Sequence, residues 1–196
     1  MPIKSDKWII KKCEIEEMIR PFSREQVKQV TLPEGNVRRV ISYGVSSYGY
    51  DMRLGNIFKV LTQGVSKEID PKNVNAGLYK TIRADDYLVV PPHGLVMGQS
   101  VEYFKIPRDI LTICFGKSTY ARCGLLVNVT PFEPEWEGFA TIALNNLTSN
   151  PIKIYSGEGI AQLIFLQAQT NDICATSYKD KAGKYQAQTE ITTARV

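Results

Sequence analysis

The chain has 196 residues, of which 43% are hydrophobic and 22% are charged, and its formal net charge is +4. This composition is ordinary for a globular protein with a real core, and the length favours one domain over two small ones. A nucleic-acid binder usually concentrates Lys and Arg in one stripe or run, and this sequence has no such run. The modest positive charge also suits a small polyanionic ligand.

The cysteine and histidine content limits the metal chemistry. The four cysteines, Cys13, Cys114, Cys123 and Cys174, form no CxxC pair, and His93 is the single histidine. A Cys/His zinc site of standard spacing therefore cannot be built. The N-terminus carries charges throughout, unlike a signal peptide, and no apolar run approaches the roughly 20 residues that span a bilayer. These features predict a cytoplasmic protein with reduced, mostly buried thiols and no membrane partner.

The N-terminal segment has the pattern of a single helix. Ser5 can cap this helix, apolar residues recur through Met18, and the helix is expected to end before Pro21. Residues 22–40 are polar and interrupted by proline and glycine, which predicts a loop or an edge strand. Residues 41–55, ISYGVSSYGYDMRLG, have the composition of a strand with a close backbone approach.

Short apolar runs follow, separated by Pro, Gly, Asn and Asp at intervals of roughly 8 to 14 residues, which predicts strands. The runs are Ile57–Leu61, Tyr87–Val90, Leu95–Met97, Ile110–Phe115, Leu125–Val129, Phe139–Leu144, Ile152–Tyr155 and Gln162–Gln167. With the helix at the front, they predict a mainly β chain, either a barrel or a sandwich. The polar, basic tail after about residue 177 has the composition of a mobile or ligand-ordered arm.

The stretch GKST at residues 116–119 looks like the end of a phosphate-binding P-loop, but the spacing excludes one. A P-loop would need glycine at position 111, where this chain has Leu111, and a longer helix after the lysine. The cluster can instead be a different anion site, in which its two hydroxyls and the charges of Lys117 and Arg122 converge on phosphate oxygens. The alternative is a turn with solvated charges.

Four longer stretches carry a family resemblance: GKSTYARCGLLVNVTPFEPEWEG, ISYGVSSYGYD, EGIAQLIF and SYKDKAGKYQAQ. Together they resemble dCTP deaminase, the nucleotide enzyme of the trimeric dUTPase superfamily, over most of the chain. The resemblance implies a single domain over residues 1–196 with a C-terminal arm from about residue 177. It also implies a distorted β-barrel of the dUTPase type with an N-terminal helix, and a homotrimer whose neighbouring subunits share active sites.

The same resemblance implies hydrolytic deamination of dCTP to dUTP and ammonia in pyrimidine deoxynucleotide metabolism, with Mg²⁺ held by the triphosphate and dTTP as an inhibitor. Zinc deaminases use H-x-E and P-C-x-x-C motifs to make hydroxide from metal-bound water, and this sequence contains neither. A zinc-free enzyme instead needs a general base to activate the water that attacks C4 of cytosine. Other groups must place that water and stabilise the developing charge.

The resemblance assigns roles to the motif KSTYAR. The Lys and the two hydroxyl residues are expected to meet the phosphates, and Ser118 and Arg122 are also expected to position the attacking water and the base. Arg122 stays protonated, so it would be a fixed charge and donor rather than a base; the alternative for it is a surface salt bridge. The nucleotide-binding stretch is Lys117, Ser118, Thr119, Tyr120, Ala121 and Arg122.

The run EGFATIALNN at residues 137–146 matches a family strand that reads like E-G-H-x-T-L-E-F-S-N. The match implies that the backbone of Thr141 and Ile142 flanks the cytosine. The family glutamate, its general base and proton shuttle, falls without a gap at Ala143, which a strand places on the same face as residue 141. Two interpretations follow: a Glu→Ala variant made to trap a nucleotide, or a natural inactive homologue.

Five further positions match the family. Gln162 corresponds to a residue at the nucleotide site, and a glutamine that satisfies backbone groups is the alternative. Tyr178 and Lys184 correspond to arm residues that meet the phosphates, and Gln188 to one at the γ-phosphate end; a solvated tail is the alternative for all three. Glu133 lies where the superfamily has an acidic residue near the deoxyribose 3′-hydroxyl.

Two other functions remain open. One is dUTP pyrophosphatase, or a bifunctional enzyme that converts dCTP to dUMP. The form KSTYAR and the tail KAGKYQAQTE favour the deaminase, because trimeric dUTPases usually end in a Gly-rich arm with an aromatic residue that stacks on uracil. The other is a nucleotide-binding protein without turnover, which Ala143 makes a real alternative.

Overall fold

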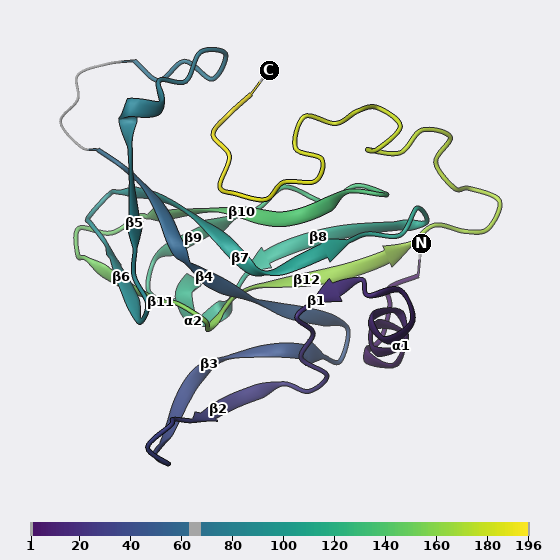
Figure 1. Ribbon diagram of the computed structural model, residues 1–196, viewed down its shortest axis with the longest axis horizontal. Helices are drawn as coiled ribbons and strands as arrows, with labels where there is room; N and C mark the ends of the chain where they lie inside the picture. Colours follow the sequence, from purple (N-terminus) through teal and green to yellow (C-terminus); the bar gives the residue numbers. More distant parts are fainter. Residues whose placement is uncertain (1, 63–67, 196) are drawn as a thin grey trace.

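The protein is described by a computed structural model that covers residues 2–62 and 68–195 (Figure 1). In the described part of the chain, no helix is long and apolar enough to cross a membrane. The helices and strands are α1 (Asp6–Glu16), β1 (Ile19–Arg20), β2 (Val27–Thr31), β3 (Val37–Ser46), β4 (Gly49–Leu61), the 3₁₀-helix η1 (Ala76–Leu78), β5 (Tyr79–Arg83), β6 (Tyr87–Val90), β7 (Leu95–Lys105), β8 (Ile110–Gly116), α2 (Ser118–Ala121), β9 (Leu125–Asn128), β10 (Glu137–Asn146), β11 (Ile152–Tyr155) and β12 (Gly159–Gln167).

Helix α1 begins where the sequence predicted and ends earlier. Ser5 precedes it with an extended backbone, and Ile9 and Cys13 are buried on its inner face. Glu17 adopts the left-handed conformation, with φ 51°, and its N–H bonds to the carbonyl of Cys13, which closes the last turn. Met18, expected on the helix, is therefore a fully buried residue of the segment that follows.

The prediction of a mainly β chain is confirmed, and every predicted apolar run lies in a strand, with β9 ending one residue short of its run. Residues 22–40, predicted as a loop or an edge strand, contain β2, which is the edge strand of the main sheet, and the start of β3, with which it pairs as a hairpin. One feature differs from expectation: the short strand β5 was not predicted. β5 has the sequence YKTIR, and among the described strands it pairs with β4 alone, so its polar residues stay exposed and it has no apolar run.

Strand β4 is the centre of the sheet. Along its length it pairs first with β3 and β12 and then with β7 and β5. The main sheet runs in the order β2-β3-β4-β7-β10-β9, β12 joins β8 to it, and β6 and β11 form a separate ribbon (Figure 1). Among the described residues these pairings follow an open, branched path and show no closed barrel, so the distorted β-barrel that the family resemblance implies stays a prediction.

Burial alternates along β10. Each even-numbered residue from Gly138 to Asn146 is buried, and each odd-numbered residue is partly exposed. Ile142 is fully buried among the core side chains. Residues 139, 141 and 143 therefore share the outer face of the strand, as the period of two predicted.

A buried charge network joins β4 to β7. Glu102 is fully buried and accepts hydrogen bonds from Nε of Arg53 at 2.7 Å, from the Arg53 N–H at 2.9 Å and from the Tyr50 hydroxyl at 3.2 Å. Burial raises the pKa of Glu102, and the charge of Arg53 opposes that rise. The motif ISYGVSSYGYDMR thus supplies two partners that satisfy a buried carboxylate.

The C-terminal tail runs back over β10 without regular secondary structure (Figure 1, yellow). Ser177, Gln188 and Ile191 are buried there. The carbonyl of Ile191 also accepts a hydrogen bond from the Lys59 ammonium at 2.7 Å, and that of Thr189 accepts one from the Gln99 amide at 3.1 Å. The tail is therefore a packed arm, held by the apolar side chains of Tyr178 and Ile191 and by several polar contacts, so the alternative of a solvated tail does not describe it.

Candidate active site

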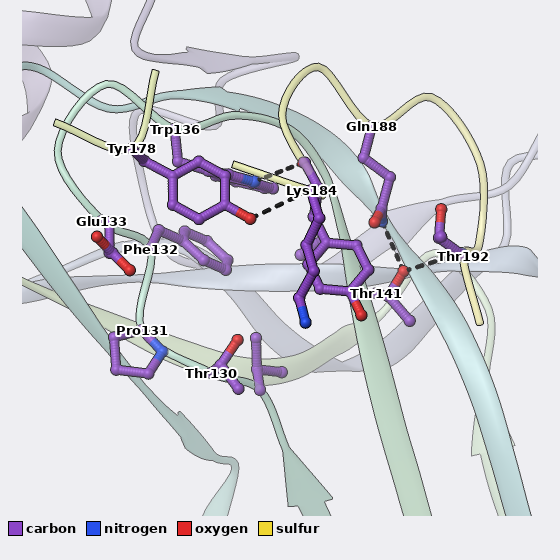
Figure 2. A pocket seen from close by; sticks show the side chains of 13 residues that line it. Thr130, Pro131, Phe132, Glu133, Trp136, Thr141, Tyr178, Lys184, Gln188 and Thr192 are labelled. Carbon is purple, nitrogen blue, oxygen red and sulfur yellow. Dashed lines mark hydrogen bonds between the residues drawn. The ribbon is translucent and has the colours of Figure 1, made fainter. Parts of the chain in front are cut away.

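A cavity of about 570 Å³ opens where β9 parts from β10. β9 pairs with β10 only at residues 143–146, and residues 129–136 then loop away from the sheet. The arm closes the free edge beyond that point, because the N–H of Phe139 donates to the carbonyl of Gln188 at 2.9 Å. The cavity therefore has three walls: strand β10, the loop after β9, and the arm (Figure 2).

Five of the side chains predicted from the sequence meet in this cavity: Glu133, Thr141, Tyr178, Lys184 and Gln188. They come from all three walls. The complete lining is Val129, Thr130, Pro131, Phe132, Glu133, Trp136, Ala140, Thr141, Tyr178, Lys184, Tyr185, Gln188 and Thr192.

Strand β10 directs the backbone of Thr141 into the gap. Backbone N–H and C=O groups alternate between the two edges of a strand. Both groups of Phe139 bond to the arm residue Gln188, and the N–H of Leu147 bonds to Gly124, so odd-numbered residues point away from β7. Thr141 follows the same alternation, and it presents one donor and one acceptor toward the cavity.

The side chain of Thr141 holds the end of the arm. Its hydroxyl accepts a hydrogen bond from the Gln188 amide at 2.6 Å and a longer one from the N–H of Thr192 at 3.4 Å (Figure 2). The Gln188 amide also donates to the Phe139 carbonyl at 2.9 Å. Gln188, expected at the γ-phosphate end of a nucleotide, is thus bonded to β10 in this structure.

Aromatic rings form one side of the cavity. Phe132 and Trp136 stack with their centroids 4.4 Å apart. The Trp136 indole N–H donates to the carbonyl of Tyr185 at 2.9 Å, and the Tyr178 hydroxyl accepts from the Tyr185 N–H at 3.0 Å. Gly183 lies flat against the Tyr178 ring, where a Cβ would come within 2.1 Å. No sequence pattern placed Trp136 or Tyr185 in the site, because their roles depend on how the arm folds back.

The charged residues of the cavity lie on different walls. The ammonium of Lys184, on the arm, donates to the carbonyl of Arg195 at 2.7 Å. The carboxylate of Glu133, on the loop, is 3.4 Å from the ammonium of Lys181, and both side chains are about half exposed. The arm thus brings cationic groups over a loop that carries a carboxylate.

The motif KSTYAR lies outside this cavity, at the end of β8 and in α2. Lys117 points into the protein: its ammonium is 2.6 Å from the Asp51 carboxylate and 3.1 Å from the Ser42 hydroxyl. The Lys117 and Asp51 side chains are only 11% and 4% exposed. Lys117, expected to meet phosphate, therefore lies in a buried ion pair, and Asp51 is a partner that the sequence did not reveal.

The remaining residues of that motif divide between surface and core. Ser118, Thr119, Ala121 and Arg122 are exposed. Tyr120 is buried, its hydroxyl accepts a hydrogen bond from the Tyr155 N–H at 3.0 Å, and burial raises its pKa to about 12.

Arg122 does not form the surface salt bridge that was the alternative to its role at the nucleotide. Its guanidinium donates to the carbonyl of Ser118 at 3.0 Å and has no carboxylate partner among residues 2–62 and 68–195. Gln162 belongs with this region, since it pairs across the sheet with Phe115 and donates to the Ser46 hydroxyl at 2.9 Å. In one chain, α2 and Gln162 thus form a second group of predicted site residues, apart from the cavity.

Ala143 lies next to the cavity on β10 without lining it. Its side chain is partly exposed on the same face as that of Thr141, about 7 Å along the strand by the spacing of alternate residues. Its cross-strand neighbours are Met97 on β7 and Asn128 on β9, neither of which is a carboxylate. Ile142 points into the core, so only its backbone faces the strand edge.

The thiols and acidic groups show no clustering typical of a metal site. Over the described ranges, no three His, Cys, Asp or Glu side chains gather in a group that could hold a metal ion. All four cysteines are free thiols. Burial raises the pKa of Cys13 and of Cys114 to about 12, so both stay protonated at neutral pH.

Comparison with known proteins places the chain in a family. A family model described as dCTP deaminase-like matches residues 3–168. A dCTP deaminase of Stenotrophomonas maltophilia (strain K279a) is 51% identical over 195 residues, covering 100% of both chains, and one of Neisseria meningitidis (serogroup B, strain MC58) is 52% identical over 192 residues, covering 98% of both. A crystal structure of 2′-deoxycytidine 5′-triphosphate deaminase from Agrobacterium tumefaciens has a similar fold, with a TM-score of 0.61 at 15% identity over 83% of this chain and 47% of that one. The chain therefore belongs to the dCTP deaminase family.

Proposed function

We propose that this chain binds dCTP together with Mg²⁺ at the cavity between β9 and β10, as an intracellular protein of deoxynucleotide metabolism. We further propose that it deaminates dCTP only very slowly, because Ala143 stands where the family has its glutamate. The observation that carries the proposal is the exposed edge of β10, where Thr141 offers a backbone donor and acceptor between an aromatic wall and a cationic arm.

The edge of β10 suits a cytosine base. Cytosine presents a ring-nitrogen acceptor beside an amino donor, and a strand residue whose N–H and C=O point the same way can meet both. Thr141 supplies this pair, and the rings of Phe132 and Trp136 supply an apolar surface beside it. Glu133, on the same loop, is then within reach of the sugar hydroxyl that the family resemblance assigns to it.

The triphosphate is proposed to extend toward the cationic groups. Lys184 on the arm lines the cavity, and Arg122 is an exposed cation without a carboxylate partner in the described part of the chain. The single carboxylate on the cavity wall, Glu133, already faces Lys181, so Mg²⁺ is expected on phosphate oxygens rather than on the protein. Mg²⁺ there neutralises phosphate charge and fixes the conformation of the triphosphate.

The two separate groups of site residues support a homotrimer of dUTPase-type barrels. In that assembly, α2 and Gln162 of one chain and the cavity of its neighbour form one site. Ser118 and Arg122 of the first chain then lie beside the cytosine bound in the second. An outer sheet face next to α2 is available for this contact, since apolar residues pair across β8 and β12: Ile113 with Ile164 and Leu111 with Leu166. Phe115, on the same face, is 55% exposed, which is unusual for a sheet face that stays in water.

The reaction needs a proton acceptor that this chain lacks at the expected position. Water adds to C4 of cytosine, and one of its protons passes through the general base to the ring nitrogen N3. The remaining hydroxyl proton then passes to the amino group, which leaves as ammonia while the C4 carbonyl of dUTP forms. A glutamate at 143 would carry these protons, and Ser118 and Arg122 would orient the water. With Ala143 the binding groups remain but the shuttle is missing, so binding without turnover is the expected behaviour.

Titration calorimetry with dCTP tests the binding, once with Mg²⁺ and once with excess chelator. We expect measurable affinity that is mostly lost on chelation. Ammonia and pyrophosphate release are assayed separately on dCTP and dUTP, because pyrophosphate release would instead support the alternative of a dUTP pyrophosphatase or a bifunctional enzyme. Tight binding with neither product fits both the proposal and the alternative of a nucleotide-binding protein without turnover. Ammonia release by an Ala143→Glu variant then distinguishes the two, since only the proposal expects this change to create activity.

A further inference from the structure

Two of the three cavity walls lie outside the sheet. The loop of residues 129–136 carries Phe132 and Glu133, and the arm carries Tyr178 and Lys184. Neither wall is held by a strand ladder along its length. A backbone hydrogen bond from the Tyr178 N–H to the carbonyl of Pro134 at 3.0 Å joins arm and loop at one point, and the remaining contacts between the two walls involve side chains.

One side chain outside the cavity touches both walls. Arg108 follows β7, and its Nη1 is 2.5 Å from Oε2 of Glu135 on the loop. Its Nη2 is 2.8 Å from Oδ2 of Asp180 on the arm and donates to the carbonyl of Ala175 at 3.1 Å. We call these contacts the Arg108 clamp.

The arm side of the clamp is locally ordered. Oδ2 of Asp180 accepts a hydrogen bond from the Ser177 N–H at 3.0 Å, and the Ser177 hydroxyl accepts one from the Asp180 N–H at 3.2 Å. Ser177 is only 1% exposed. The first turn of the arm thus places one carboxylate where the guanidinium can reach it.

The clamp acts next to the residues that shape the cavity. Glu135 immediately precedes Trp136, and Ser177 immediately precedes Tyr178. Trp136 and Tyr178 both bond to Tyr185, which joins loop and arm at the cavity. A shift at the clamp would therefore move both walls at that junction.

The geometry points to Arg108 as a positioning residue for nucleotide binding: together with the Tyr178–Pro134 backbone bond, it holds the loop and arm walls of the cavity at their separation. The inference rests on the proposed function, since dCTP is the ligand whose affinity it affects. The planar guanidinium suits this task because its fork of donors can meet two carboxylates at once, which a lysine ammonium cannot do with the same geometry.

The test compares Arg108→Gln with the parent chain and with Arg83→Gln, which breaks an exposed ion pair between Arg83 and Asp85 on and after β5. Arg108→Lys keeps the charge without the fork, and Asp180→Asn weakens the clamp from the arm side without altering the sheet. Three quantities are measured for each protein: the thermal midpoint, the rate of tryptic cleavage within the arm without nucleotide, and the Kd for dCTP.

We expect Arg108→Gln and Asp180→Asn to cleave faster in the arm and to bind dCTP roughly two- to tenfold more weakly, the effect of losing one or two partly exposed ion pairs. Arg108→Lys should lie between them and the parent, and all midpoints should stay close to that of Arg83→Gln. An unchanged Kd in both clamp variants overturns the inference, as does an equal loss in Arg83→Gln. If the parent binds no dCTP, the proposed function fails on its own, and unchanged arm cleavage would still refute the clamp.

Discussion

At the scale of single residues, Lys117 shows that the surroundings of a residue in the fold can differ from those that its sequence motif indicates. Its position in KSTYAR indicated a phosphate ligand, yet its ammonium lies against Asp51 and Ser42 in a nearly buried pocket. No pattern in the sequence links positions 51 and 117. They meet because β12 pairs with β4 on one side and with β8, which Lys117 follows, on the other. Removing one partner of a buried ion pair leaves the other charge desolvated and unpaired.

We therefore predict that Lys117→Met destabilises the fold by about 3 kcal/mol, measured by urea unfolding. Asp51→Asn should also destabilise it, and the double variant should cost less than the sum of the two, since neither charge is then left alone. Stability of Lys117→Met equal to that of the parent would instead assign Lys117 to solvent and to the phosphates.

The cysteines give a second test at this scale. Because the pKa of Cys13 and of Cys114 is raised to about 12 by burial, their thiols stay protonated and resist alkylation at pH 8. Cys123 is exposed at the end of α2 and should react first with iodoacetamide. Peptide mass spectrometry of the native protein measures this order; rapid labelling of Cys114 would contradict the packing described for β8.

At the scale of elements, the arm is the part that composition described least well. Its many polar residues predicted a mobile or ligand-ordered segment, but Ile191, which is 2% exposed, and Tyr178, which packs against the core, anchor it to the protein. Two such residues in a polar tail are too weak a signal for sequence reasoning to separate from chance. The strands were predictable for the opposite reason, since alternating apolar runs mark them directly.

Ile191→Ala should loosen the arm and leave the sheet intact. The buried side chain is worth on the order of 2–3 kcal/mol of docking, so hydrogen exchange at residues 187–192 should accelerate while β7 and β10 stay protected. The control Ile173→Ala changes a 44% exposed isoleucine before the arm and should have little effect. Uniform acceleration across the sheet would show that the arm belongs to the core.

At the scale of the whole molecule, the sequence predicted the class of fold, the β-strands and the family, but not how the site residues are distributed. The short apolar runs between turn residues predicted the strands, and the four long motifs carried the family resemblance. The separation of α2 from the cavity depends on the curvature of the sheet and on the path of the arm, which no local pattern encodes. The shared outer face of Thr141 and Ala143 was predictable, because it needs only the period of a strand.

The proposed trimer also makes a prediction for the assembly. If neighbouring chains complete each other's sites, replacing an exposed apolar residue of the β8–β12 face should weaken both association and binding. Phe115→Glu is expected to shift the protein from trimer to monomer in analytical ultracentrifugation and to lower its affinity for dCTP. A Phe115→Glu protein that remains trimeric would place the subunit contact on another face.

The central claim is that this chain keeps the nucleotide site of its family and lacks only the proton shuttle at position 143. The most direct measurement is ammonia release from dCTP by Ala143→Glu, with the parent and Ala143→Gln, which has a similar side chain but no base, measured beside it. Adding a general base typically raises a rate by roughly 10²–10⁴-fold, so we predict at least about a hundredfold gain for Ala143→Glu alone, with dCTP affinity much less affected. Equal rates in all three proteins, despite tight dCTP binding, would contradict the account.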